Sequence, residues 1–168
     1  MRVFNAAVIG VGRVGFLLEL DKLRGGCCTH TGAYHNHPNF RLIAIADINA
    51  KHLTACAEFY KLPKTATFLD YKKMLAERKD IDVISIATWT NTHKQIFEDC
   101  ICQPNIKLIF LEKPIALTLD DALYMQKLAI KNKKLVAINF ERRWETAYIE
   151  TKKIIVAKKF GELRTIYG

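Results

Sequence analysis

The sequence predicts an α/β fold with a doubly wound, mostly parallel sheet and helices on both of its faces. Apolar runs alternate with amphipathic stretches along the chain, and most of these runs are apolar at successive positions rather than at every second one. A glycine-rich turn follows the first run. Strands that are apolar throughout are buried on both faces, as in a parallel sheet covered by helices.

Six apolar segments are expected to form the strands of this sheet. They are Val3–Ile9, Phe40–Ala46, Thr65–Phe68, Val83–Ala87, Leu108–Leu111 and Leu135–Ile138. The amphipathic stretches between and after them predict helices by their apolar spacing. These helices are Val14–Leu23, Ala50–Tyr60, Tyr71–Arg78, Thr92–Cys102, Leu119–Asn132 and Glu145–Ala157.

Helix boundaries are indicated by capping residues. Asp70 and Thr118 occupy N-cap positions, and Asp121, three residues after Thr118, is typical of a capping box. The connection Arg24–Pro38, rich in glycine, cysteine and histidine, is expected to be irregular.

The last residues predict a second structural region. Gly161 is expected to end the last helix, and "ELRTIYG" then to begin another strand. Its backbone groups need partners, so this strand either joins a sheet edge or begins a further part of a longer protein. We therefore expect a nucleotide-binding domain at 1–145, followed at 146–168 by a connecting helix and the first strand of a further α/β domain.

Composition excludes several classes of protein. No apolar run approaches the roughly 18 residues of a membrane span, and the apolar N-terminus turns into glycines, as a first strand does. The net charge is +9, but the lysines are dispersed in pairs such as Lys72-Lys73 and Lys152-Lys153. This pattern is typical of solvated helix faces, so no nucleic-acid partner is expected, although a positive field favours an anionic ligand.

The five cysteines form no CxxC pair, which indicates a reducing, cytoplasmic setting. Cys27, Cys28, His30, His35 and His37 gather in one segment. Their spacing fits no usual zinc pattern, so we expect loop packing there and no metal site.

The glycine turn predicts a dinucleotide site. Gly10, Gly12 and Gly15 have GxGxxG spacing between a strand and a helix. The first glycine allows a tight turn, the second lets a pyrophosphate approach the backbone, and the third lets the helix pack closely. The helix N-terminus would offer N–H groups to the phosphates, and the intervening Arg13 and Val14 are expected to contact the cofactor.

An acidic residue ends the second strand. Asp47 follows "IAIA", where a carboxylate can bind the adenosine ribose hydroxyls and would repel a 2′-phosphate, so NAD is favoured over NADP. It lies 32 residues after Gly15, and the Arg24–Pro38 connection accounts for the excess over the usual separation. The alternative is that Asp47 caps the next helix.

The ends of the later strands should meet the same crevice. Thr88, Asn91 and Thr92 follow the fourth strand and can cap a helix or contact ribose and nicotinamide. His93 is either a cofactor contact or a structural residue of the first helical turn.

The fifth strand ends in Glu112-Lys113-Pro114, and Arg142 and Arg143 follow the sixth. Lys113 is the candidate catalytic residue because it can bind a substrate hydroxyl or transfer its proton. Glu112 would orient Lys113 or hydrogen-bond nearby backbone, and Pro114 would aim the turn. The alternative is an ion pair at a turn.

Taken together, five segments resemble the Gfo/Idh/MocA family of NAD(P)-dependent oxidoreductases. They are "GVGRVG" at 10–15, "IAIAD" at 43–47, "TWTNTH" at 88–93, "EKPIALT" at 112–118 and "NFERRW" at 139–144. The resemblance implies a Rossmann domain that binds NAD, with Lys113 near nicotinamide and substrate and with Arg143 as the arginine of the last segment. Trp89 stands where the family usually has proline, and "THTGAY" at 29–34 resembles only a subset.

The resemblance further implies hydride transfer involving a hydroxyl carbon of a sugar, sugar nucleotide or inositol. The family's second domain, which supplies much of the substrate pocket and of the dimer interface, is absent from the 168 residues. We therefore expect NAD binding with little turnover by this chain alone, and a homo-oligomer remains possible. The alternative hypothesis is a non-catalytic dinucleotide-binding or interaction module.

Overall fold

A computed structural model describes residues 2–24 and 27–167 of the chain. The chain forms two units, one ending at Ile138 and one beginning at Asn139, and each is described by itself.

The first unit is built on a sheet with strand order β3-β2-β1-β4-β5-β6. The strands are β1 (Phe4–Ile9), β2 (Phe40–Ala46), β3 (Thr67–Phe68), β4 (Val83–Ile86), β5 (Leu108–Glu112) and β6 (Leu135–Asn139), the last of which crosses into the second unit. The pairs β1–β2, β1–β4, β2–β3 and β4–β5 are parallel. The order reverses direction between β1 and β4, so this is the doubly wound sheet that the sequence predicts.

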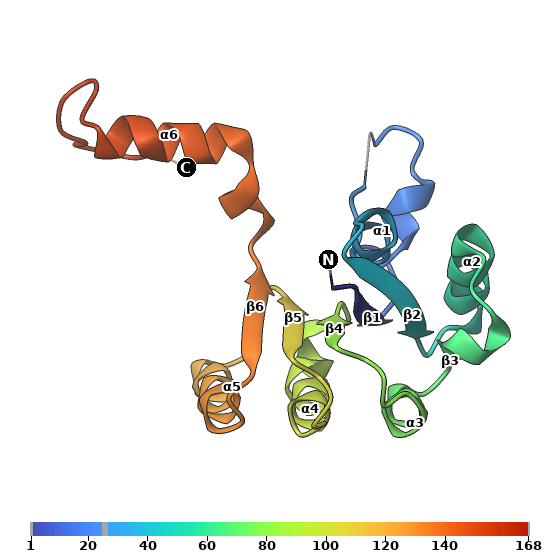
Figure 1. Cartoon of the computed structure of the whole chain (residues 1–168). Helices are drawn as coiled ribbons and strands as arrows, with labels where there is room; N and C mark the ends of the chain where they lie inside the picture. The colour runs from blue at the N-terminus through green and yellow to red at the C-terminus, as the bar shows by residue number, and fades with distance from the viewer. Residues whose placement is uncertain (1, 25–26, 168) are drawn as a thin grey trace. The chain divides into compact units, whose positions relative to one another are not determined.

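Helices cover both faces of the sheet (Figure 1). The helices of the first unit are α1 (His30–Asn36), α2 (Ala50–Tyr60), α3 (Tyr71–Glu77), α4 (Thr90–Ile101) and α5 (Leu119–Lys131). Side chains of α1 and α2 share one core cluster, and side chains of α3, α4 and α5 share the other.

The central strand β1 shows why its residues are apolar throughout. Ala6 and Val8 belong to the core cluster of α1 and α2, whereas Ala7 and Ile9 belong to the opposite cluster. All four are essentially inaccessible to solvent. Because successive side chains of a strand point to opposite faces, a strand between two helical layers is apolar at every position.

Two of the expected N-caps are confirmed. Asp70 accepts the N–H of Lys72 at the start of α3, and Thr118 accepts the N–H of Asp121 at the start of α5. Asp121 in turn accepts the hydroxyl of Thr118 at 2.9 Å, a variant of the capping box in which the side chains bond to each other.

The expected helix Val14–Leu23 is wrong. The N–H groups of Phe16 and Leu17 both donate to the carbonyl of Gly12, and after this single turn the chain passes into the 3₁₀ helix η1 (Leu17–Leu20). Phe16 has a φ of −153°, which is not helical, and this change of backbone direction ends the turn.

The connection expected to be irregular contains α1. The first two N–H groups of α1, those of His30 and Thr31, donate to the carbonyls of Val14 and Gly15. Each donor lies sixteen positions after its acceptor, whereas in a continuous α-helix it would lie four positions after it. The helix that leaves the glycine turn is therefore interrupted after Gly15 and resumes in α1. The segment between them, of which residues 16–24 and 27–29 are described, is called the excursion below. The prediction failed because the excursion is held by tertiary contacts and because the sequence of α1 contains a glycine.

Two further boundaries differ from expectation by two residues, and the others by one at most. Helix α4 begins at Thr90 rather than Thr92, with Trp89 as its N-cap residue. A 3₁₀ turn, η2 (Lys64–Ala66), replaces the start of the third expected strand.

The second unit contains a 3₁₀ helix, η3 (Glu141–Trp144), and α6 (Thr146–Val156). Every residue of α6 is exposed. Gly161 has a φ of +90° and forms an isolated bridge with Lys159. The strand expected from Glu162 onward is not formed in residues 162–167, and Gly168 lies outside the described residues.

Candidate functional site

The glycine turn lies between the carboxyl ends of β1 and β4, where the strand order reverses. Gly10 has a φ of +88°, and a Cβ placed on it would lie 2.6 Å from the carbonyl oxygen of Ala87. A Cβ on Gly15 would overlap the carbonyl oxygen of Gly10. Both positions therefore require glycine for the turn to close.

Gly12 differs from the other two glycines of the turn. A Cβ placed on it would meet none of the described atoms within 4 Å, and its backbone is not in the left-handed region. Folding of the described chain therefore does not require glycine at position 12. The open space beside it is the place where a ligand can approach the backbone.

Asp47 links the end of β2 to this turn. Its Oδ2 accepts the N–H of Val11 at 2.8 Å, and its Oδ1 accepts the N–H of Asn49 at 2.8 Å. Its side chain is about 10% exposed. Asn49, not Asp47, is the N-cap residue of α2, because the Asn49 side chain accepts the N–H of Lys51.

The segment after β4 presents both exposed and buried groups. Trp89 is 85% exposed, and Asn91 is exposed in the first turn of α4. The hydroxyl of Thr92 lies 2.8 Å from both the hydroxyl of Thr88 and the carbonyl oxygen of Trp89. Trp89 is the N-cap residue of α4 and makes no side-chain capping bond, so none of Thr88, Asn91 and Thr92 is the N-cap residue.

His93 is completely buried. Its Nδ1 lies 3.0 Å from the carbonyl oxygen of Pro114, and its Nε2 lies 3.1 Å from the carbonyl oxygen of Thr88. Through these two contacts the His93 ring connects the segment after β4 to the turn after β5. Because the ring is completely buried, a ligand at the surface does not reach it.

Glu112 and Lys113 form that turn. Glu112 ends β5 and is only 5% exposed, whereas Lys113 is exposed. The Oε2 of Glu112 accepts the backbone N–H of Lys113 at 3.1 Å. The peptide bond between Lys113 and Pro114 is cis. The turn thus buries the carboxylate and directs the lysine toward the surface.

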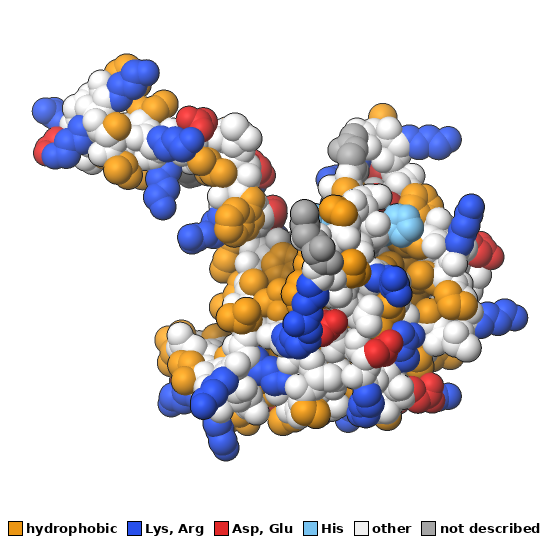
Figure 2. All heavy atoms as spheres, in the orientation of Figure 1, with side chains coloured by type: hydrophobic (Ala, Val, Ile, Leu, Met, Phe, Trp, Pro, Cys, Tyr) orange, Lys and Arg blue, Asp and Glu red, His pale blue; other side chains and the backbone are white. Residues whose placement is uncertain are grey.

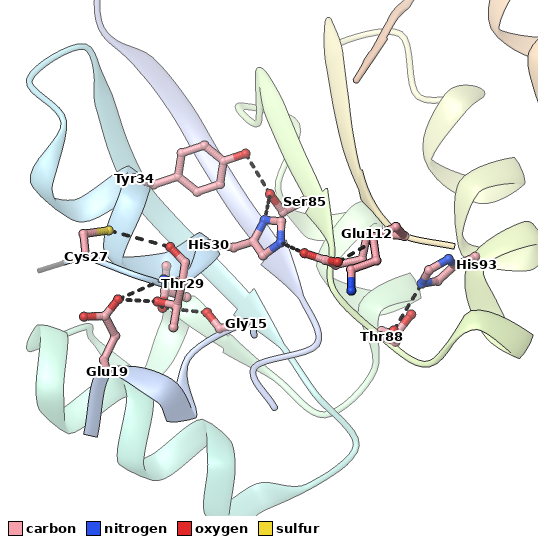
Figure 3. A network of polar contacts seen from close by, with 12 residues as sticks. Gly15, Glu19, Cys27, Thr29, His30, Tyr34, Ser85, Thr88, His93 and Glu112 are labelled. Atoms are coloured by element: carbon pink, nitrogen blue, oxygen red, sulfur yellow. Dashed lines mark hydrogen bonds and ion pairs between the residues drawn. The ribbon is translucent and has the colours of Figure 1, made fainter. Parts of the chain in front are cut away.

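A buried set of polar side chains lies next to Glu112 (Figure 3). His30 of α1 places Nε2 2.9 Å from Glu112 Oε1 and Nδ1 2.9 Å from the hydroxyl oxygen of Ser85 in β4. The hydroxyl of Tyr34 lies 2.8 Å from the same Ser85 oxygen. Leaving any one of these buried groups without a partner would cost about 1–3 kcal/mol, so their pairing matters to stability.

Sequence reasoning missed this buried set. Ser85 was the available signal, because a hydroxyl in the middle of "VISIA" needs a partner inside the protein. His30 was assigned to loop packing with its neighbouring cysteines and histidines. Among the described residues, no group of three or more His, Cys, Asp and Glu side chains is placed to hold a metal ion.

Arg13 is exposed in the glycine turn, and Val14 is partly buried. Arg142 and Arg143 belong to η3 of the second unit, where Arg142 Nη1 lies 3.2 Å from the Tyr148 hydroxyl. Arg143 is exposed. The two arginines are described within their own unit only.

Charged side chains are scattered over the surface of the first unit in the view of Figure 2. Lys72 pairs with Asp99, and Lys73 pairs with Glu77, with both lysine side chains more than half exposed. In the described parts of the chain, no helix is long and apolar enough to cross a membrane.

Comparison with known proteins gives the same fold. A family model described as an oxidoreductase family with an NAD-binding Rossmann fold matches residues 4–140. Inositol 2-dehydrogenase of Gluconacetobacter diazotrophicus is 27% identical over 162 residues, which cover 96% of this chain and 44% of that protein. An inositol 2-dehydrogenase/D-chiro-inositol 3-dehydrogenase of Shouchella clausii is 27% identical over 159 residues, which cover 94% and 42%.

Solved structures share the architecture over a similar range. The WlbA dehydrogenase of Chromobacterium violaceum, solved with NADH and UDP-GlcNAcA, has a TM-score of 0.78 at 25% identity, covering 96% of this chain and 42% of that one. The scyllo-inositol dehydrogenase of Lactobacillus casei, solved with NAD(H) and scyllo-inositol, has a TM-score of 0.77 at 21% identity, covering 95% and 43%.

The chain therefore spans less than half the length of the relatives that it matches. The family model, in contrast, matches most of the chain, from the first residue of β1 to the residue after β6. This chain belongs to the Gfo/Idh/MocA oxidoreductase family, and its fold is that family's NAD-binding Rossmann fold.

Proposed function

We propose that this chain is the cofactor-binding portion of an NAD-dependent oxidoreductase that acts on a hydroxyl carbon of a sugar, sugar nucleotide or inositol-like substrate. One observation carries the proposal: the glycine turn, Asp47 and Lys113 all lie at the carboxyl ends of strands in a doubly wound sheet. Ligands of such sheets bind at that edge, where the strand order reverses. Inositol dehydrogenases among the relatives support the substrate class.

The glycine turn would hold the pyrophosphate. The open space at Gly12 fits a phosphate against the backbone, and the exposed Arg13 adds a positive charge beside it. Val14 and Gly15 complete the turn. Because residues 14–23 form no α-helix, the positive end of a long helix dipole contributes less here than in an uninterrupted fold.

Asp47 favours NAD over NADP. Each of its oxygens accepts one backbone N–H, and a carboxylate oxygen has a second lone pair for a ribose hydroxyl. A 2′-phosphate would meet the same negative charge and be repelled.

Lys113 would bind the reacting hydroxyl and assist its proton transfer. The nicotinamide, when bound, supplies the hydride chemistry. Glu112 accepts the backbone N–H of Lys113, which fixes the point at which the lysine side chain leaves the turn. Thr88 and Asn91 are further candidate cofactor contacts within the first unit, whereas we propose that His93 positions the two turns without touching the cofactor.

The test is titration of the 168-residue chain with NADH, followed by fluorescence and calorimetry, with NADPH in parallel. The proposal predicts saturable NADH binding that is tighter than NADPH binding. Turnover is then screened with NAD and inositols, sugars and nucleotide sugars. Saturable binding with little or no turnover is the result expected for this chain alone, and a folded chain that binds neither cofactor contradicts the proposed function.

A further inference from the structure

The buried polar side chains beside Glu112 form one continuous chain of contacts. It runs from the Tyr34 hydroxyl to the Ser85 hydroxyl, then through the two nitrogens of His30 to Glu112, and from Glu112 to the backbone of Lys113 (Figure 3). Tyr34 and Ser85 are each at most 7% exposed, so water does not compete for these contacts. The chain joins α1, β4 and the turn after β5.

The donors and acceptors fit one direction. Glu112 Oε2 accepts the Lys113 N–H, and an ionised carboxylate accepts at Oε1 as well, which makes His30 Nε2 the donor. A neutral His30 then accepts the Ser85 hydroxyl proton at Nδ1, and Ser85 accepts the Tyr34 hydroxyl proton. Burial raises the pKa of Tyr34 to about 12, in agreement with a protonated donor at the start of the chain.

The reverse direction leaves a group without a partner. If Glu112 were protonated and donated to His30, then His30 would donate to Ser85, and Ser85 to Tyr34. The Tyr34 proton would then need an acceptor, and the hydrogen bonds of the described residues give the Tyr34 hydroxyl only Ser85. A buried donor without an acceptor is unfavourable.

The helix that carries His30 is itself anchored to the glycine turn. Glu19 Oε1 accepts the N–H of Cys28, the N–H of Thr29 and the hydroxyl of Thr29, the last at 2.6 Å. The N–H of His30 donates to the carbonyl of Val14 in the glycine turn at 3.2 Å. The position of the His30 ring is therefore set by the excursion and the glycine turn together.

We infer that His30 is a positioning residue of the cofactor crevice: held as the neutral Nε2–H tautomer by Ser85, it fixes the Glu112 carboxylate and thereby the backbone of Lys113. This inference rests on the proposed function for the role of Lys113. One buried imidazole thereby contributes a connection between the pyrophosphate side and the nicotinamide side of the crevice.

The tautomer is tested first, by two-bond proton–nitrogen NMR spectra of the ¹⁵N-labelled 168-residue chain near neutral pH. The five histidines are few enough for His30→Gln to assign the His30 signals by their disappearance. The inference predicts a protonated Nε2 and an unprotonated Nδ1. An Nδ1–H tautomer or a doubly protonated ring overturns it.

Variants then separate positioning from packing. In His30→Gln the amide nitrogen stands close to the place of Nε2 and can still donate to Glu112, whereas His30→Met fills the space without a donor. We expect NADH affinity within about threefold of the unmodified chain for His30→Gln and weakened by about tenfold or more for His30→Met. His35→Gln, an exposed residue of the same helix, is the matched control and should leave affinity unchanged.

The backbone amide of Lys113 provides a readout that does not depend on the cofactor. Its chemical shift should be retained in His30→Gln, and should change in His30→Met and in the milder Ser85→Ala. A folded His30→Met with an unchanged Lys113 amide overturns the inference, as does one with unchanged NADH affinity. If the unmodified chain binds no NADH, the proposed function fails, and the Lys113 amide alone decides the positioning role.

Discussion

The carboxylate of Asp47, at the end of β2, accepts the backbone N–H of Val11 in the glycine turn at 2.8 Å. One side chain therefore joins the two places where a dinucleotide would contact this chain, its ribose and its pyrophosphate. Asp47 also accepts the N–H of Asn49, which caps α2, so its geometry is fixed before any ligand arrives. Preorganisation of this kind reduces the cost of binding.

Removing the charge of Asp47 should change cofactor preference. Asp47→Asn keeps one oxygen acceptor but no longer repels a 2′-phosphate. We expect NADH affinity to fall by about tenfold and the preference for NADH over NADPH to shrink or reverse. Titration with both cofactors measures this ratio. Asp120→Asn, at an exposed position of α5, is the control, and an unchanged ratio in Asp47→Asn would show that Asp47 does not face the ribose.

Replacing Gly10 or Gly12 of the glycine turn by alanine should have different effects on stability and on NADH affinity. Gly12→Ala adds a methyl group to open space, so stability should stay within about 0.5 kcal/mol while NADH affinity falls at least about tenfold. Gly10→Ala combines a left-handed φ with a close approach to Ala87, and should destabilise the fold by about 2 kcal/mol or more. Urea unfolding and NADH titration separate the two effects. Equal losses of stability would contradict this assignment.

Substitution of Gly32 should show how Glu19, in the excursion, supports α1. A Cβ on Gly32 would overlap the carboxylate of Glu19, which accepts three donors at the start of α1. Gly32→Ala should therefore destabilise the chain by about 1–3 kcal/mol, and much less so when Glu19→Ala is already present. The double-mutant cycle is measured by urea unfolding. Additive effects would mean that Gly32 and Glu19 do not meet.

Stability should fall in acid partly through Asp80. The Arg78 guanidinium donates to both oxygens of Asp80 and lowers the pKa of that carboxyl. Because the folded pKa lies below the unfolded value of about 3.9, the contribution is present above that pH and is lost as pH falls through the folded pKa. Asp80→Asn should lose less stability than the unmodified chain between about pH 6 and pH 3. Parallel urea curves at each pH check this, and equal acid sensitivity of the two proteins would refute it.

The strands and the placement of the glycine turn could be predicted because local pattern determines them. Fully apolar runs identify strands that lie between two helical layers. Gly10 and Asp47 each follow such a strand, and in a parallel sheet the carboxyl ends of these two strands lie at the same edge. The caps at Asp70 and Thr118 were predictable for the same reason, since a cap depends on residues within one helical turn.

The buried chain of contacts could not be predicted in the same way. His30 meets Ser85 and Glu112 across 55 and 82 positions of sequence, and no local pattern encodes such a contact. The interruption after Gly15 was missed for a related reason, because the carboxylate of Glu19 and the carbonyls of the glycine turn hold α1 from outside its own sequence. The burial of His93 likewise follows from the turn after β5, which packs over it.

The central claim, a dinucleotide site at the glycine turn, is tested most directly by amide chemical-shift mapping of the labelled chain during NADH titration. We expect saturable shifts concentrated at Gly12, Asp47, Thr88 and Lys113, all at the carboxyl edge of the sheet. Shifts confined instead to the groove between α2 and α3, lined by Leu53, Thr54 and Lys73 among others, would contradict the claim, as would a folded chain without any saturable shift.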